Sequence, residues 1–108
     1  MMYYELNVDN KIYKLRLTTF TTVQLEKKLN CNPLSIFGDG ETIPTVTTMV
    51  YILHAALQQY HHNVDINEAY NIFDAWLEDN HSMTDFIAVI IELYKVSGLI
   101  KVEKNEKN

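Results

Sequence analysis

Residues that cross-link or interrupt a chain are scarce in this sequence: its 108 residues include one cysteine, two prolines and three glycines. The single cysteine, Cys31, excludes an internal disulfide, and with no apolar signal segment at the N-terminus it indicates a reducing, cytosolic location. No apolar run approaches the roughly 20 residues that cross a bilayer, so we expect no membrane contact. With 47% hydrophobic residues, the composition predicts one folded domain that forms its core without disulfides.

Positive charge is scarce over most of the chain. Residues 1–31 hold three acids and five bases, residues 32–100 hold nine acids and one base, and residues 101–108 hold two acids and three bases. Because an acidic body repels phosphate, we expect no nucleic-acid partner. Two interpretations of the acidity remain open: a solvated surface that keeps the protein soluble, or a surface that meets a basic partner.

The spacings typical of catalytic and metal sites are missing. The sequence has no HxxxH or CxxC pair for a metal, no GxSxG for a nucleophile and no glycine-rich phosphate loop. His61 and His62 are adjacent, so on a helix they would point about 100° apart. We therefore expect no catalytic residue, no metal, no cofactor and no enzyme activity.

Residues 2–17 have the pattern of a β-hairpin with a two-residue loop at Asp9-Asn10. This loop fixes the register, and the register places apolar residues together on one face. The predicted apolar pairs are Leu6–Tyr13, Tyr4–Leu15 and Met2–Leu17, and the pairs on the other face are Glu5–Lys14 and Tyr3–Arg16. Since a lone hairpin is marginally stable, its apolar face must pack on the helices that follow.

The first helix has two start signals after this hairpin. Thr21 is predicted as N-cap, with Gln24 three residues later at the spacing of a capping box. Phe20 and Leu25 then fall at the positions of a hydrophobic staple.

Four further segments complete the expected fold. They are a turn capped by Asn32 that begins at Pro33 and ends before Gly38, a helix from Pro44 or Thr45 to Tyr60 or His61, a helix from Asp65, and a central, largely buried helix from Ser82 to Gly98. The fold class is therefore α+β, mainly α: an N-terminal two-stranded antiparallel β-hairpin packed on about four α-helices. Residues 1–100 form a single globular domain (hairpin 2–17, helical body 21–100), and residues 101–108 form a polar, flexible tail.

Apolar residues exceed what the core of this fold needs. Phe73 and Trp76 lie on the apolar stripe of the third helix, so we expect both to be buried. A second set lies off the main stripes or after the last cap: Tyr51, Ile52, Ala55, Tyr94, Leu99 and Ile100. We interpret this set as a surface for a partner or for self-association, which favours a homo-oligomer; the alternative is a wider core.

Three blocks of the sequence resemble a known family. They are YKLRLTTFTTVQLEKKLNCNPLSIF, IPTVTTMVYILHAALQQYHH and AYNIFDAWLEDNHSMTDFIAVIIELYKVSGLI. The blocks are similar to the tail-assembly chaperones of long-tailed, siphovirus-type phages and prophages of Gram-positive bacteria. The similarity runs over about Leu15–Ile100 and consists of structural motifs, without a catalytic signature.

The resemblance implies a late viral protein in the cytoplasm of the host bacterium. Such a chaperone binds the tape-measure protein and keeps that long chain soluble while the tail tube assembles. It is absent from the mature virion, and in many phages a longer, frameshifted form also recruits the tail tube protein.

Two other functions remain as alternatives. One is a structural head–tail joining or tail component that is retained in the virion. The other is a small helical transcription regulator, which the acidic body disfavours.

Overall fold

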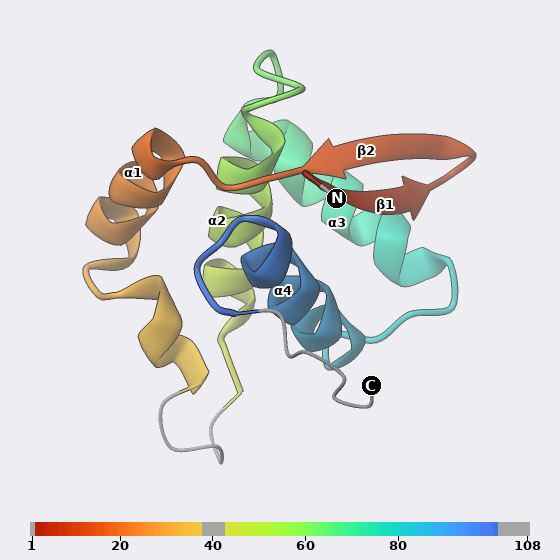
Figure 1. Ribbon diagram of the computed structural model, residues 1–108. Helices are drawn as coiled ribbons and strands as arrows, with labels where there is room; N and C mark the ends of the chain where they lie inside the picture. The colour runs from red at the N-terminus through yellow and green to blue at the C-terminus, as the bar shows by residue number, and fades with distance from the viewer. Residues whose placement is uncertain (1, 38–42, 102–108) are drawn as a thin grey trace, which may run out of the picture.

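The computed structural model describes residues 2–37 and 43–101, in which a hairpin is followed by four α-helices (Figure 1). The elements are β1 (Tyr4–Val8), β2 (Lys11–Leu15), α1 (Thr19–Leu29), the 3₁₀ helix η1 (Pro33–Phe37), α2 (Val46–Leu57), α3 (Ile66–Glu78) and α4 (Asp85–Val96). This is the predicted α+β, mainly α fold. The predicted tail lies, apart from Lys101, outside the described residues.

The hairpin has the predicted register. Its ladder pairs Tyr4 with Leu15, Glu5 with Lys14 and Leu6 with Tyr13. Asp9 and Asn10 have φ values of 50° and 63°, the left-handed conformation that a two-residue type I′ turn requires. The strands cover less of the chain than the predicted hairpin, residues 2–17. The predicted pairs Met2–Leu17 and Tyr3–Arg16 therefore lie beyond the ladder.

The outer edge of β2 is covered by the end of α2. The Lys14 amide donates to Nε2 of His61 at 3.0 Å, and the Arg16 amide donates to the Ala56 carbonyl at 2.9 Å. One residue later, the Leu17 amide donates to Oγ of Ser97 at 2.9 Å. These bonds satisfy backbone groups that an open sheet edge would expose, and they hold the apolar face of the hairpin against the helices.

Helix α1 begins earlier than predicted. Its N-cap is Thr18 and not Thr21: the Thr21 amide donates to Oγ1 of Thr18 at 3.1 Å, and the Thr18 amide donates to Oγ1 of Thr21 at 2.8 Å. Thr21 therefore occupies the third helical position of the capping box. The staple positions move with the cap, and Phe20 is 71% exposed, so the predicted staple is wrong. The shift arises because Thr18 offers the same cap chemistry immediately after Leu17, whose amide is fixed to Ser97.

The N-termini of the next segments agree with the sequence pattern. Oδ1 of Asn32 accepts the Leu34 amide at the start of η1, and Oδ1 of Asp65 accepts the Glu68 amide at the start of α3. Thr45 is the N-cap of α2 and accepts the Thr48 amide. Gly38, the predicted end of the η1 turn, lies outside the described residues.

Two helix boundaries differ from the prediction. Helix α2 ends at Leu57, because the side chain of Gln58 donates to the carbonyls of His54 and Val64 and reverses the chain. Helix α4 begins at Asp85 and not at Ser82, its predicted start, although the Ser82 amide donates to Oδ2 of Asp85 and the Asp85 amide donates to Oγ of Ser82.

The end of α4 is the predicted one. Gly98 has φ 83°, and the Leu99 amide donates to the Tyr94 carbonyl at 2.9 Å while the Gly98 amide donates to Lys95 at 3.2 Å. This pair of bonds is a Schellman motif, which needs a left-handed residue that glycine adopts without steric cost.

Helix α2 is the central helix, a role that the sequence had suggested for α4. It packs on α1, α3, α4 and β2, and seven of its twelve residues are buried. Helix α4 buries Phe86, Val89, Ile90, Leu93 and Tyr94 but exposes Ala88 and Glu92, so it packs through one side. Figure 1 shows α1 and the hairpin on opposite sides of the α2–α4 pair.

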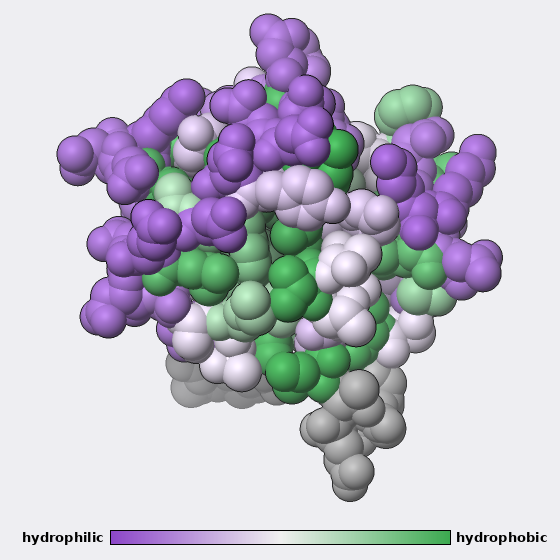
Figure 2. Space-filling model, turned by 180° about the vertical axis from the view of Figure 1, so that it is seen from behind, coloured by the Kyte–Doolittle hydropathy of each residue, from purple (hydrophilic) through white to green (hydrophobic). Residues whose placement is uncertain are grey.

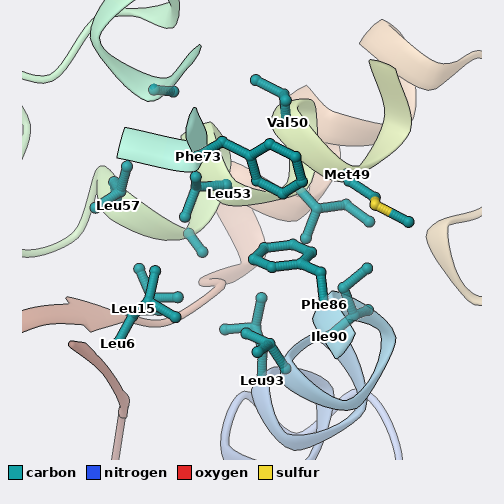
Figure 3. Packing of buried hydrophobic residues seen from close by; sticks show 14 of the residues in the cluster. Leu6, Leu15, Met49, Val50, Leu53, Leu57, Phe73, Phe86, Ile90 and Leu93 are labelled. Atoms are coloured by element: carbon teal, nitrogen blue, oxygen red, sulfur yellow. The ribbon is translucent and has the colours of Figure 1, made fainter. Parts of the chain in front are cut away.

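The core forms where α2, α3, α4 and the hairpin meet (Figure 3). Phe73 and Trp76 are both buried, as predicted, and each ring packs edge-on against Phe86, with centroids 5.1 and 5.3 Å away. The ring of His81 stacks on Trp76 at 4.1 Å, and its Nδ1 lies 2.9 Å from the Trp76 carbonyl oxygen. This aromatic cluster fixes the turn between α3 and α4.

Candidate partner-binding groove

The predicted partner surface does not form one exposed patch. Ile52 and Tyr94 are only 0% and 1% exposed, so assigning these two to a surface was wrong, whereas Ala55, 7% exposed, lines the groove described below. Tyr51, Leu99 and Ile100 are partly buried and pack against the core. The reason is the central place of α2, which buries side chains on more than its main stripe.

The hydroxyl of Tyr94 shows how complete this burial is. It donates to the Pro33 carbonyl oxygen at 2.9 Å and so joins α4 to η1. Burial, with a smaller contribution from Cys31, raises the pKa of this hydroxyl far above its ordinary value. Tyr94 is therefore a neutral core residue that satisfies the carbonyl of Pro33, the first residue of η1.

Other apolar side chains are exposed in the described residues. Figure 2 shows hydrophobic residues gathered near the middle of one face, with hydrophilic residues above them and on both sides. Phe20 has the largest exposed fraction of the large apolar residues, and the next are Met2, Ile43 and Ile12. From the sequence we assigned Phe20 to the hydrophobic staple and therefore missed its exposure. An N-cap at Thr18 instead of Thr21 would have placed Phe20 outside the staple.

A groove of about 500 Å³ lies between α1 and α2. Each helix contributes side chains at the spacing i, i+3, i+4, i+7, which is one face of a helix. The row from α1 is Thr21, Gln24, Leu25 and Lys28, and the row from α2 and its C-cap is Tyr51, His54, Ala55 and Gln58. Phe20 also lines the groove. The volume lies within the range of sites that bind ligands or side chains of a partner.

Lys28 dominates the electrostatics of this groove. Its Nζ lies 5.6 Å from the centre of the Tyr51 ring, within the range of a cation–π contact. Burial, and then the positive charge of Lys28, lowers the pKa of His54, with Asp65 acting in the opposite direction. No Asp or Glu is among the described residues that line the groove. It therefore combines apolar walls with one fixed positive charge.

A second hollow, of about 310 Å³, lies between β1, the end of α3 and the start of α4. Glu5, Asp79, Asp85 and His81 are among the residues that line it. The ring of His81 is fixed by its stack on Trp76 and its contact with the carbonyl there. Within residues 2–37 and 43–101, no group of three or more His, Cys, Asp or Glu residues is placed to hold a metal ion. We therefore assign His81 a structural role in this hollow and do not treat the hollow as a candidate reaction site.

Comparison with known protein families matches residues 5–108 to a family model. The matching model describes a family of unknown function, DUF6096. The chain belongs to the DUF6096 family. No curated protein and no solved structure matches it. Among the described residues of this DUF6096 protein, no helix has the length and apolar character needed to span a membrane.

Proposed function

We propose that this DUF6096 protein is a phage tail-assembly chaperone, which binds the tape-measure protein and keeps it soluble while the tail tube forms. The observation that carries the proposal is the resemblance of Leu15–Ile100 to that family, in blocks that coincide with architectural features. The block LEKKLNCNPL spans the junction of α1 and η1, and the block DAWLEDNHSMTDFI spans the aromatic turn between α3 and α4. The protein acts by binding alone, without catalysis or cofactor.

The physical chemistry of the chain supports this role. A tape-measure protein is long and helical, so before the tube surrounds it, its apolar faces are open to aggregation. A folded helical body that exposes apolar side chains such as Phe20 can cover such a face. The proposal includes a location in the host cytoplasm, absence from the mature virion, homo-oligomer formation and contact of a longer form with the tail tube protein.

The test is co-expression with a tape-measure protein from the same phage or prophage genome. We expect the tape-measure protein to remain in the supernatant and to co-purify with this chain, and light scattering of the lysate to fall. Equal scattering with and without the chain would contradict the chaperone function. Mass spectrometry of purified virions separates the alternative, because a head–tail joining or tail component would be present there in stoichiometric amount.

A further inference from the structure

We propose that the α1–α2 groove binds an amphipathic helix of the partner, and that Lys28 selects a helix with a carboxylate beside its apolar row. For the name of the partner, the tape-measure protein, this inference rests on the proposed function. The chemistry of the groove is argued from the described residues alone.

The walls of the groove favour a helical occupant. Both walls are helices, whose backbone groups are hydrogen-bonded internally, so an extended peptide would find no free edge with which to form a ladder. From Tyr51 to Gln58 the α2 wall runs roughly 10 Å, about two helical turns. An apolar row at i, i+3, i+4 and i+7 on a partner helix matches that length, and the exposed ring of Phe20 offers it an aromatic contact.

The charge of the groove selects the occupant. None of the described acids of the helical body lines the groove: they are Glu26 on α1, Asp65, Glu68, Asp74, Glu78 and Asp79 on α3 and its caps, and Asp85 and Glu92 on α4. In the groove, Lys28 lies over Tyr51 and no described residue forms an ion pair with it. An acidic side chain on the partner therefore complements this site, whereas a basic one is repelled. The acidity of the chain had left open a surface that meets a basic partner, and the charge of this groove favours an acidic side chain on the partner instead.

A second copy of the chain fits the groove less well. The outer face of α3 carries acids but only one exposed large apolar residue, Tyr70. The exposed large apolar residues of α1 are only Phe20 and Val23, and the acid that follows them, Glu26, stands directly before the two bases Lys27 and Lys28. Neither helix offers a four-residue apolar row at i, i+3, i+4 and i+7 beside a carboxylate that has no base next to it. The partner is therefore a different protein, and self-association becomes an outcome that the experiment detects.

The first experiment uses two designed helices roughly 18 residues long, since much shorter helices are marginal in water. Both carry the same leucine row, flanked by Glu in one and by Lys in the other. Fluorescence anisotropy measures their affinity for the wild type, for Lys28→Glu and for the matched control Lys27→Glu, which makes the same charge change on α1 outside the groove.

We expect the Glu helix to bind wild type and Lys27→Glu about three- to tenfold more tightly than the Lys helix. Lys28→Glu should invert this preference. Amide NMR shifts should concentrate along α1 and α2. Equal binding of both helices to all three proteins, no binding of either, or shifts outside the groove would overturn the inference. So would an unlabelled second copy that displaces the Glu helix at similar concentration.

The second experiment separates failure of this inference from failure of the proposed function. Tape-measure protein is co-expressed with the wild type, with Gln24→Trp, which fills the groove, and with Val23→Trp, which adds the same ring on α1 outside it. We expect the wild type and Val23→Trp to keep the partner soluble and Gln24→Trp to fail. If all three succeed, the groove is wrong and the function stands. If the wild type fails, the function is wrong, and the peptide experiment still decides the chemistry of the groove.

Discussion

A few aromatic side chains make most of the contacts at the turn between α3 and α4. The Trp76 ring packs edge-on against Phe86 and stacks on the rings of Phe73 and His81. At 3% exposure, it has almost no contact with solvent. A cavity at this point would loosen the packing of α3 on α4, because the Trp76 ring lies where these two helices meet.

Trp76→Ala should lower the free energy of unfolding by about 3–5 kcal/mol, since it removes buried aromatic surface and leaves a cavity. Urea denaturation followed by circular dichroism measures the loss. Tyr70→Ala is the matched control, because Tyr70 lies on the same helix and is 45% exposed. Identical midpoints for wild type and Trp76→Ala would show that the site is not part of the core.

His61 makes stability depend on pH. Its Nε2 accepts the Lys14 amide, so the ring must be neutral there. Burial first, and then the nearby charges of Lys11, Lys14 and His62, lower its pKa from 6.5. The unfolded chain therefore takes up the proton before the folded one, and the stabilisation present above pH 6.5 is lost as pH falls below it.

We expect the free energy of unfolding to decrease between pH 6.5 and more acidic values, and to decrease less in His61→Gln. Glutamine keeps an acceptor for Lys14 but does not titrate. Thermal unfolding at a series of pH values measures the slopes. His61→Gln also loses the edge contact between the Tyr13 ring and His61, which changes stability at every pH but not its slope with pH. Parallel slopes for the two proteins would therefore assign the pH dependence to another group.

At the scale of elements, short-range signals set most of the helix boundaries. The Thr18–Thr21 box starts α1, Asp65 starts α3, and Gly98 ends α4. Gln58 ends α2 by bonding to Val64, a contact across the next turn. Local signals thus set where the helices begin and where α4 ends, whereas the end of α2 is set by a side chain that bonds to the following turn.

Thr18→Ala should destabilise the protein by about 1 kcal/mol, because it removes the acceptor for the Thr21 amide at the start of α1. Thr19→Ala is the control, since Thr19 is exposed at the first position of the same helix. Chemical denaturation of the two variants gives the difference. A larger loss for Thr19→Ala would place the cap elsewhere.

For the whole molecule, α2 is the element that holds the layers together. Ile52 lies on it with 0% exposure, although its position off the main stripe had suggested a surface residue. Ile52→Glu should therefore unfold the chain instead of impairing partner binding alone, because an unpaired buried carboxylate costs several kcal/mol and small domains have only about 5–15 kcal/mol in total.

The helical circular-dichroism signal of Ile52→Glu should be largely lost at 25 °C, whereas Ile12→Glu, on an exposed face of the hairpin, should keep it. A folded Ile52→Glu protein would indicate that α2 is less central than the packing suggests.

The sequence pattern predicted what depends on a few neighbouring residues. The Asp9-Asn10 turn and the alternation beside it determine the hairpin register, and the caps at Asp65 and Gly98 depend on single residues. Burial of Ile52 and Ala55, the exposure of Phe20 and the groove itself depend on how α1 docks on α2. No period within one helix encodes that docking, so these features required the structure.

Two hydrogen bonds join the start of the helical body to its end, from the Leu17 amide to Ser97 and from the Arg16 guanidinium to the Val96 carbonyl. Each spans 80 residues of sequence. During synthesis on the ribosome, the hairpin and α1 are therefore made long before the groups that anchor them. The domain reaches its native state only after α4 has emerged, and a nascent chain stalled before Ser97 would expose the apolar face of the hairpin to the cell's own proteases and chaperones.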